Sequence, residues 1–129
     1  MKRFLAMVII LIGVASLVLG IIFIVQSGSA KQEIADSLAP VTISEVDGKY
    51  DAVTAKQKAA MQAEEPKIQA GQAAPSASYN YLSAQRALLG LAKSNIGVAS
   101  FLLMSGIVEI VLGIGLVLAG LMLSMKQTA

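Results

Sequence analysis

The chain has 129 residues, of which 56% are apolar and 14% are charged, with a formal net charge of +2. Soluble domains carry about 25% charged residues, so this composition excludes an ordinary water-soluble fold. Cysteine, histidine and tryptophan are absent, which excludes disulfides, thiolate or imidazole metal ligands, and nucleophilic catalysis by cysteine or histidine.

The sequence also lacks the features of an enzyme or a nucleic-acid binder. No nucleotide-binding loop, metal-ligand cluster or catalytic triad can be assembled from its residues. Its basic residues form no patch with interleaved aromatics. We therefore expect no catalytic residue, no cofactor, no metal and no nucleic-acid partner.

Charge is distributed unevenly along the chain. Residues 31–93 hold fourteen of the eighteen charged residues, divided evenly between acids and bases, whereas residues 4–25 and 96–125 are almost wholly apolar. This pattern predicts an all-α membrane protein in which two transmembrane helices form an antiparallel hairpin with a helical extramembrane projection.

Residues 4–25 form the first predicted span. They provide 22 uncharged residues, where about 20 are needed to cross a hydrocarbon core about 30 Å thick. A secretory signal is the alternative, because Lys2 and Arg3 precede the stretch and Gly28, Ser29 and Ala30 resemble a cleavage site. Signal-peptide apolar regions are usually about 7–15 residues long, so we expect the segment to be retained as a membrane helix.

Residues 96–125 form the second predicted span, with Glu109 as their one charge, and no proline follows Pro75. Basic residues without acidic neighbours flank the two spans at Lys2, Arg3 and Lys126. Because positive flanks favour the cytoplasm, residues 1–3 and 126–129 are predicted to be cytoplasmic in a multi-pass protein of the cell membrane. Residues 26–95 would then be extracellular or periplasmic.

Three helices are predicted in the intervening segment, at about 31–39, 43–65 and 78–95. Pro40 disfavours helix at the residue before it, Thr42 and Glu45 have the spacing of a capping box, and Pro66 marks the expected end of the second helix. The apolar stripes here are rich in alanine and bury little area. We expect the segment to pack against its own copies or another subunit, or to be a partly mobile connector.

Small residues recur every seven positions in both spans. A seven-residue repeat keeps these residues on one face of a left-handed helix pair, where they let two backbones approach closely in lipid. Matching depth in an antiparallel pair sets Gly20 beside Gly106, Gly13 beside Gly113 and Ala6 beside Gly120. Whether the repeat joins helices within a chain or between chains stays open. The predicted packing residues are Ala6, Gly13, Gly20, Ala99, Gly106, Gly113 and Gly120.

Glu109 is the candidate functional residue within the spans. A charged side chain in mid-membrane costs at least about 2.5 kcal/mol, and neither span contains a cation to neutralise it. We expect Glu109 to be protonated, hydrated, or held by Ser16, Ser105 or another subunit. It could serve ion or proton translocation, or it could join helices by hydrogen bonding.

These features predict a non-enzymatic membrane scaffold that forms homo-oligomers through small-residue helix faces and displays a helical extracytoplasmic region. Two alternatives remain. The chain could form an ion- or proton-conducting oligomer that uses Glu109, or it could be an accessory subunit that binds other membrane proteins in the lipid bilayer.

Overall fold

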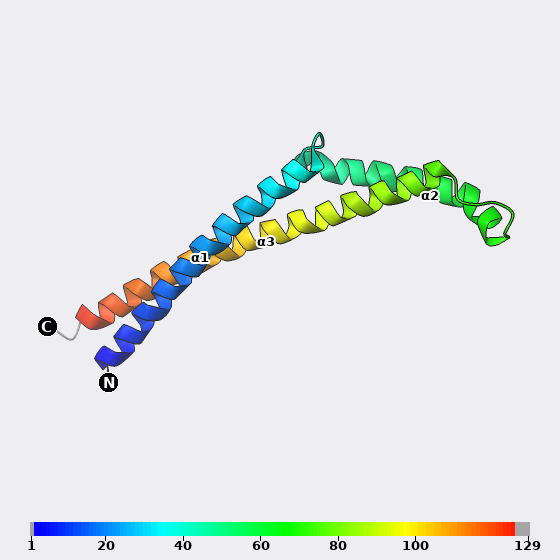
Figure 1. Ribbon diagram of the computed structural model, residues 1–129. Coiled ribbons are helices and arrows are strands. Elements are labelled where there is room, and N and C mark those ends of the chain that lie inside the picture. The colour runs from blue at the N-terminus through cyan, green and yellow to red at the C-terminus, as the bar shows by residue number, and fades with distance from the viewer. Residues whose placement is uncertain (1, 126–129) are drawn as a thin grey trace. The chain divides into compact units, whose positions relative to one another are not determined.

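Residues 2–125 are described by a computed structural model that contains three α-helices and one short 3₁₀ turn (Figure 1). In chain order these are α1 (Lys2–Leu38), η1 (Ile43–Glu45), α2 (Val46–Gln69) and α3 (Ala77–Met125). The described residues contain no strand, so the predicted all-helical class is confirmed. Met1 and the predicted cytoplasmic end at 126–129, including Lys126, lie outside the described residues.

Both long helices have the length and composition needed to cross a membrane. The apolar residues of α1 and α3 lie in one of two compact units, formed by Met1–Lys31 with Val98–Ala129. The second unit is Gln32–Gly97 and contains the end of α1, η1, α2 and the beginning of α3. We call these the apolar unit and the polar unit.

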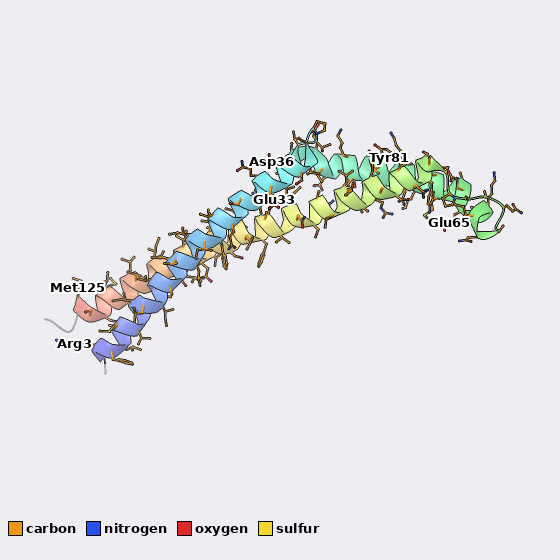
Figure 2. All side chains as sticks on the ribbon, viewed as in Figure 1. Arg3, Glu33, Asp36, Glu65, Tyr81 and Met125 are labelled. Carbon is orange, nitrogen blue, oxygen red and sulfur yellow. The ribbon has the colours of Figure 1, made fainter. Side chains whose placement is uncertain are left out.

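In the apolar unit, α1 and α3 lie side by side and run in opposite directions. Gly20 faces Gly106 and Gly13 faces Gly113, so residue numbers rise along one helix as they fall along the other. Figure 1 shows this pair as the blue part of α1 beside the orange and red part of α3. Arg3 and Met125 therefore lie at the same end of the unit (Figure 2).

In the polar unit, α2 lies against the first half of α3, also in the opposite direction. The contacts pair Gln57 with Ser83 and Glu64 with Ser76. Seven residues separate the two positions on each helix, so this pair repeats with the period expected of a supercoiled helix pair.

The end of α2 differs from the sequence prediction. The helix was expected to end near Pro66, but it continues to Gln69 with Pro66 inside it. Proline takes one N–H out of the helix, but later donors close the last turn. The N–H of Gly71 bonds to Ile68 O at 3.0 Å, and that of Gln72 bonds to Lys67 O at 2.9 Å. Gly71 has φ +69°, and this αL residue completes a Schellman cap. The glycine cap, rather than the proline, ends the helix.

Side-chain hydrogen bonds cap the starts of η1 and α3. Thr42 and Glu45 form the expected capping box, and the Glu45 carboxylate accepts the backbone N–H of Thr42 at 3.0 Å. Ser76 precedes α3, and its hydroxyl accepts the N–H of Tyr79 at 3.0 Å. Helix α3 therefore begins at Ala77, one residue before the predicted start.

Candidate functional site

The buried residues of the apolar unit form one continuous series. Every buried position described in this unit is small, and along each helix the buried positions are seven residues apart. We call this series the small-residue seam. It consists of Ala6, Gly13, Gly20 and Ser27 on α1 with Ala99, Gly106, Gly113 and Gly120 on α3.

The two backbones are close enough at the seam to exclude any side chain on its glycines. A Cβ atom added to Gly20 would lie 2.7 Å from the carbonyl oxygen of Gly106, and one added to Gly13 would lie 2.9 Å from that of Gly113. Gly120 faces Ala6, whose carbonyl oxygen would lie 3.0 Å from an added Cβ. The structure thus brings together all seven packing residues named from the sequence, within a single chain and in the depth-matched register.

Ser27 continues the seam by one further step, although it is not among the packing residues predicted from the sequence. Its side chain is 1% exposed, and its hydroxyl donates to the carbonyl oxygen of Ala99 at 2.6 Å. The sequence contains the pattern that identifies Ser27, because this residue lies seven positions after Gly20, the same spacing that separates the other seam residues. A serine can occupy this position because its hydroxyl bonds to the facing backbone.

Large aliphatic side chains fill the flank of the seam. Each lies four residues after a small residue and contacts the glycine on the opposite helix, as Ile110 does at Gly20 and Ile24 does at Gly106. Small residues thus set the distance between the backbones while aliphatic residues provide the contact area. These aliphatic residues were not predicted from the sequence; they are Ile10, Leu17, Ile24, Ile110 and Val117.

Ser16 and Glu109 meet across the seam. The Ser16 hydroxyl donates to Oε2 of Glu109 at 2.8 Å, and both side chains are half-buried. Ser105 is half-buried as well, but within residues 2–125 no hydrogen bond joins it to Glu109. Glu109 therefore has a polar partner on the facing helix of its own chain, as the sequence analysis allowed for Ser16.

The outward face of the apolar unit consists of large apolar side chains. Phe4, Phe101 and Met122 are at least 70% exposed, and only 11% of the most apolar stretch of each helix is buried. A helix in the core of a soluble protein would instead be mostly buried. The arrangement places small residues inside and large apolar residues outside.

A ladder of polar contacts joins α2 to α3 in the polar unit. Gln57 is 8% exposed, donates to the Ser83 hydroxyl at 3.2 Å and accepts from Arg86 at 2.8 Å. More than one helical turn away, the ammonium of Lys93 lies 3.0 Å from an Asp47 carboxylate oxygen and 5.4 Å from the centre of the Tyr50 ring. The hydrogen bond to Asp47 raises the pKa of Lys93 above its usual value.

The far end of this helix pair is closed by Glu64. Its carboxylate accepts the Ser76 hydroxyl at 2.6 Å and the Ser76 backbone N–H at 2.9 Å, and these bonds lower the pKa of Glu64. The neighbouring Glu65 accepts the Tyr79 hydroxyl at 3.3 Å. Partial desolvation, with the nearby Glu65 charge, raises the pKa of Tyr79.

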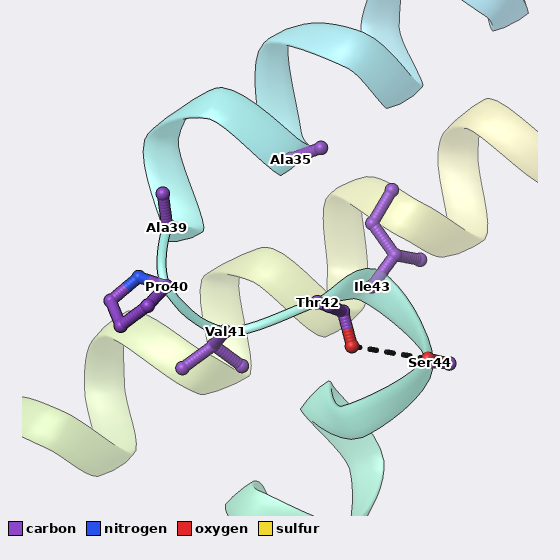
Figure 3. A pocket seen from close by; sticks show the side chains of 7 residues that line it. All are labelled: Ala35, Ala39, Pro40, Val41, Thr42, Ile43 and Ser44. Atoms are coloured by element: carbon purple, nitrogen blue, oxygen red, sulfur yellow. Dashed lines mark hydrogen bonds between the residues drawn. The ribbon is translucent and has the colours of Figure 1, made fainter.

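A hollow lies at the turn between α1 and α2 (Figure 3). It is wide open, and its lining is apolar apart from Thr42 and Ser44, whose hydroxyls are 3.1 Å apart. No charged side chain lines it. Among residues 2–125, no group of three or more acidic, histidine or cysteine side chains is placed to hold a metal ion.

No protein-family model, curated protein or solved structure matches this chain. Its function is therefore inferred from its own residues and their contacts.

Proposed function

We propose that this chain is a non-enzymatic membrane scaffold that self-associates. It crosses the bilayer twice as an antiparallel hairpin, keeps both ends in the cytoplasm and holds the polar unit outside as a helical projection. The lipid bilayer and further copies of the chain are its partners.

One observation carries this proposal, namely the outward orientation of the large apolar side chains of α1 and α3 around a seam of small residues. In water such a surface would far exceed the few hundred Å² of contiguous apolar patch that soluble monomers tolerate. In lipid the same apolar surface carries no solvation penalty. Association of the two helices there depends on close backbone contact, which the seam provides.

The Ser16–Glu109 hydrogen bond supports a structural role for the acidic residue. An interhelical hydrogen bond in a membrane contributes about 0.6 kcal/mol on average and also favours one register. Ser16 and Glu109 lie at the level of the seam, between Gly13 and Gly20 and between Gly106 and Gly113. A single polar pair at this depth opposes sliding of one helix along the other.

Self-association requires a surface other than the seam. The seven small residues, which the sequence allowed to join helices either within a chain or between chains, are used within one chain. The surfaces left for a second copy are the outer faces, including Gly115, which has open space around it.

The mass of the purified full chain in mild detergent, measured by native mass spectrometry, tests this proposal. The scaffold predicts a homogeneous particle that contains several copies of this chain and no other polypeptide. A monomer would contradict self-association. A particle that contains unrelated chains would instead favour an accessory subunit of a larger complex.

An ion-conducting oligomer is the second candidate, favoured by the half-exposed carboxyl of Glu109 within an apolar helix. The Glu109→Gln variant separates the two functions, because an amide oxygen still accepts the Ser16 hydroxyl but carries no proton for transport. The scaffold predicts an unchanged particle without ion flux in either protein. Flux into vesicles that is present for the original chain and lost in Glu109→Gln would support conduction.

A further inference from the structure

The exposed apolar residues of the polar unit are not scattered. Four large ones are exposed in this unit, and three of them, Tyr81, Leu88 and Leu91, lie on α3 with exposures of 61–66%. Together with Ala84 and Asn95 they follow steps of three, four, three and four residues, and all five are exposed. We call these five residues the outer stripe.

This spacing is that of the a and d positions of a coiled coil. Tyr81, Leu88 and Asn95 occupy a positions, and Ala84 and Leu91 occupy d positions. Helix α2 covers a different side of α3, through Ser83, Arg86 and other residues, so the outer stripe is not part of the α2 contact. It is a helix face with coiled-coil periodicity and no partner within the described part of the chain.

From this we propose that the outer stripe is the contact through which the α3 helices of two copies of this chain pair in parallel as a short coiled coil. The proposal rests on the membrane scaffold proposed above. Copies inserted with the same topology have α3 running in the same direction, so each stripe residue meets its own counterpart.

The charges around the stripe fit a second copy. The positions that flank the stripe are all uncharged, so two identical helices meet without repulsion between like charges. The two cations of this part of α3 are held on the other side, Lys93 by Asp47 at 3.0 Å and Arg86 by Gln57 at 2.8 Å. The flanking residues are Asn80, Gln85, Ala87, Ala92 and Ser94.

Asn95 also fits this partner. A single asparagine at an a position lowers the stability of a coiled coil but pairs with its own counterpart, which fixes register and oligomer state. In a parallel pair in register, the two Asn95 side chains meet. The stripe spans only about two heptads, so pairing depends on the high effective concentration that a shared membrane gives.

Disulfide formation by single cysteines in native membranes tests the proposal, because the chain has no cysteine of its own. Leu88→Cys and Leu91→Cys are compared with Met61→Cys, which replaces the remaining exposed large apolar residue of the polar unit, on α2. We expect about tenfold more disulfide-linked dimer from each stripe variant than from Met61→Cys, because paired helices hold these thiols together.

The size of the detergent particle provides the second measurement. Leu88→Lys places two like charges at a paired position and should weaken association about tenfold, whereas Met61→Lys should not change it. A multi-copy particle in which Leu88→Cys and Leu91→Cys cross-link no better than Met61→Cys would overturn the coiled coil and leave the scaffold intact. A monomeric particle of the original chain would overturn both.

Discussion

Glycines in α1 and α3 differ in the space around them. Gly20 lies in the seam, where an added Cβ would be 2.7 Å from a backbone oxygen, whereas Gly115 has nothing within 4 Å of that position. Backbone cannot yield as a flexible side chain can, so Gly20→Ala forces the helices apart. We expect this substitution to destabilise the helix pair by about 1–3 kcal/mol, as overpacking does elsewhere.

Gly115→Ala is the matched control, because it adds the same methyl group to a mid-helix glycine that faces open space. Its effect should stay within about 0.5 kcal/mol. Energy transfer between dyes on cysteines at the exposed positions Phe4 and Met122 would follow separation of the helices as SDS is added to mild detergent. Equal midpoints for the two variants would contradict the close approach at the seam.

The carboxyl of Glu64 makes the end of the polar unit sensitive to pH. Its pKa is below the ordinary value of 4.5 because Ser76 donates two hydrogen bonds to the carboxylate. A depressed pKa in the folded state means that the carboxylate stabilises the fold above pH 4.5, and that this contribution is lost as the pH falls through the lower, folded value. The protection of the Ser76 amide against hydrogen exchange, measured relative to its intrinsic exchange rate, should therefore fall below pH 4.5.

Glu64→Gln provides the comparison for this prediction. The amide does not titrate over this range, so exchange at Ser76 should lose its dependence on this carboxyl and follow only the intrinsic chemistry of exchange. An identical loss of protection in both proteins would show that another group controls the end of the helix pair.

At the scale of the helices, the local sequence predicted which segments are helical better than it predicted the residue at which each helix ends. Composition located the apolar parts of α1 and α3, and the capping box located the start of the second outer helix. Pro66 does not end α2, because one proline in the last turn removes a single hydrogen bond, whereas the αL residue Gly71 closes the helix after Gln69, three residues later.

The seam could be read from spacing alone, since the seven-residue repeat of small residues is a local pattern. The outer stripe could not, because several large apolar residues of α3 lie at helical spacing and the sequence does not say which of them α2 covers. Tyr79 bonds to Glu65 on α2, while Leu88 and Leu91 are exposed. Assigning a residue to one face or the other requires the position of the neighbouring helix.

The antiparallel register of α1 and α3 makes a prediction about cross-linking. Ser27 and Ala99 face each other in the seam, so Ser27→Cys combined with Ala99→Cys should form a disulfide within the chain on mild oxidation. The control pairs Ser27→Cys with Ser100→Cys, because Ser100 is the next residue of α3 and is exposed rather than part of the seam.

A protease site inserted between Ala73 and Ala74 reports the bond, since cleavage there leaves α1 and α3 in separate fragments. The fragments should stay joined without reductant in the first variant and separate in the control. Equal joining in both variants would contradict the register.

At the scale of the whole molecule, polarity is divided between the two units. The charged side chains are concentrated in Gln32–Gly97, as the labelled Glu33, Asp36 and Glu65 illustrate, whereas the apolar unit exposes hydrocarbon over its length (Figure 2). A chain that crosses the bilayer twice satisfies both units, because it puts one in lipid and the other in water.

The proposed scaffold requires that the polar unit lies on one side of the membrane and both ends of the chain lie on the other. Single cysteines at Lys58, in α2, and at Thr128, beyond the described residues, would be labelled with a membrane-impermeant maleimide in sealed cells or vesicles whose outer face is the extracytoplasmic one. The proposed topology predicts that the Lys58→Cys variant is labelled at once and the Thr128→Cys variant only after the membrane is permeabilised. Labelling of both cysteines before permeabilisation, or of neither, would contradict a hairpin that spans the membrane twice.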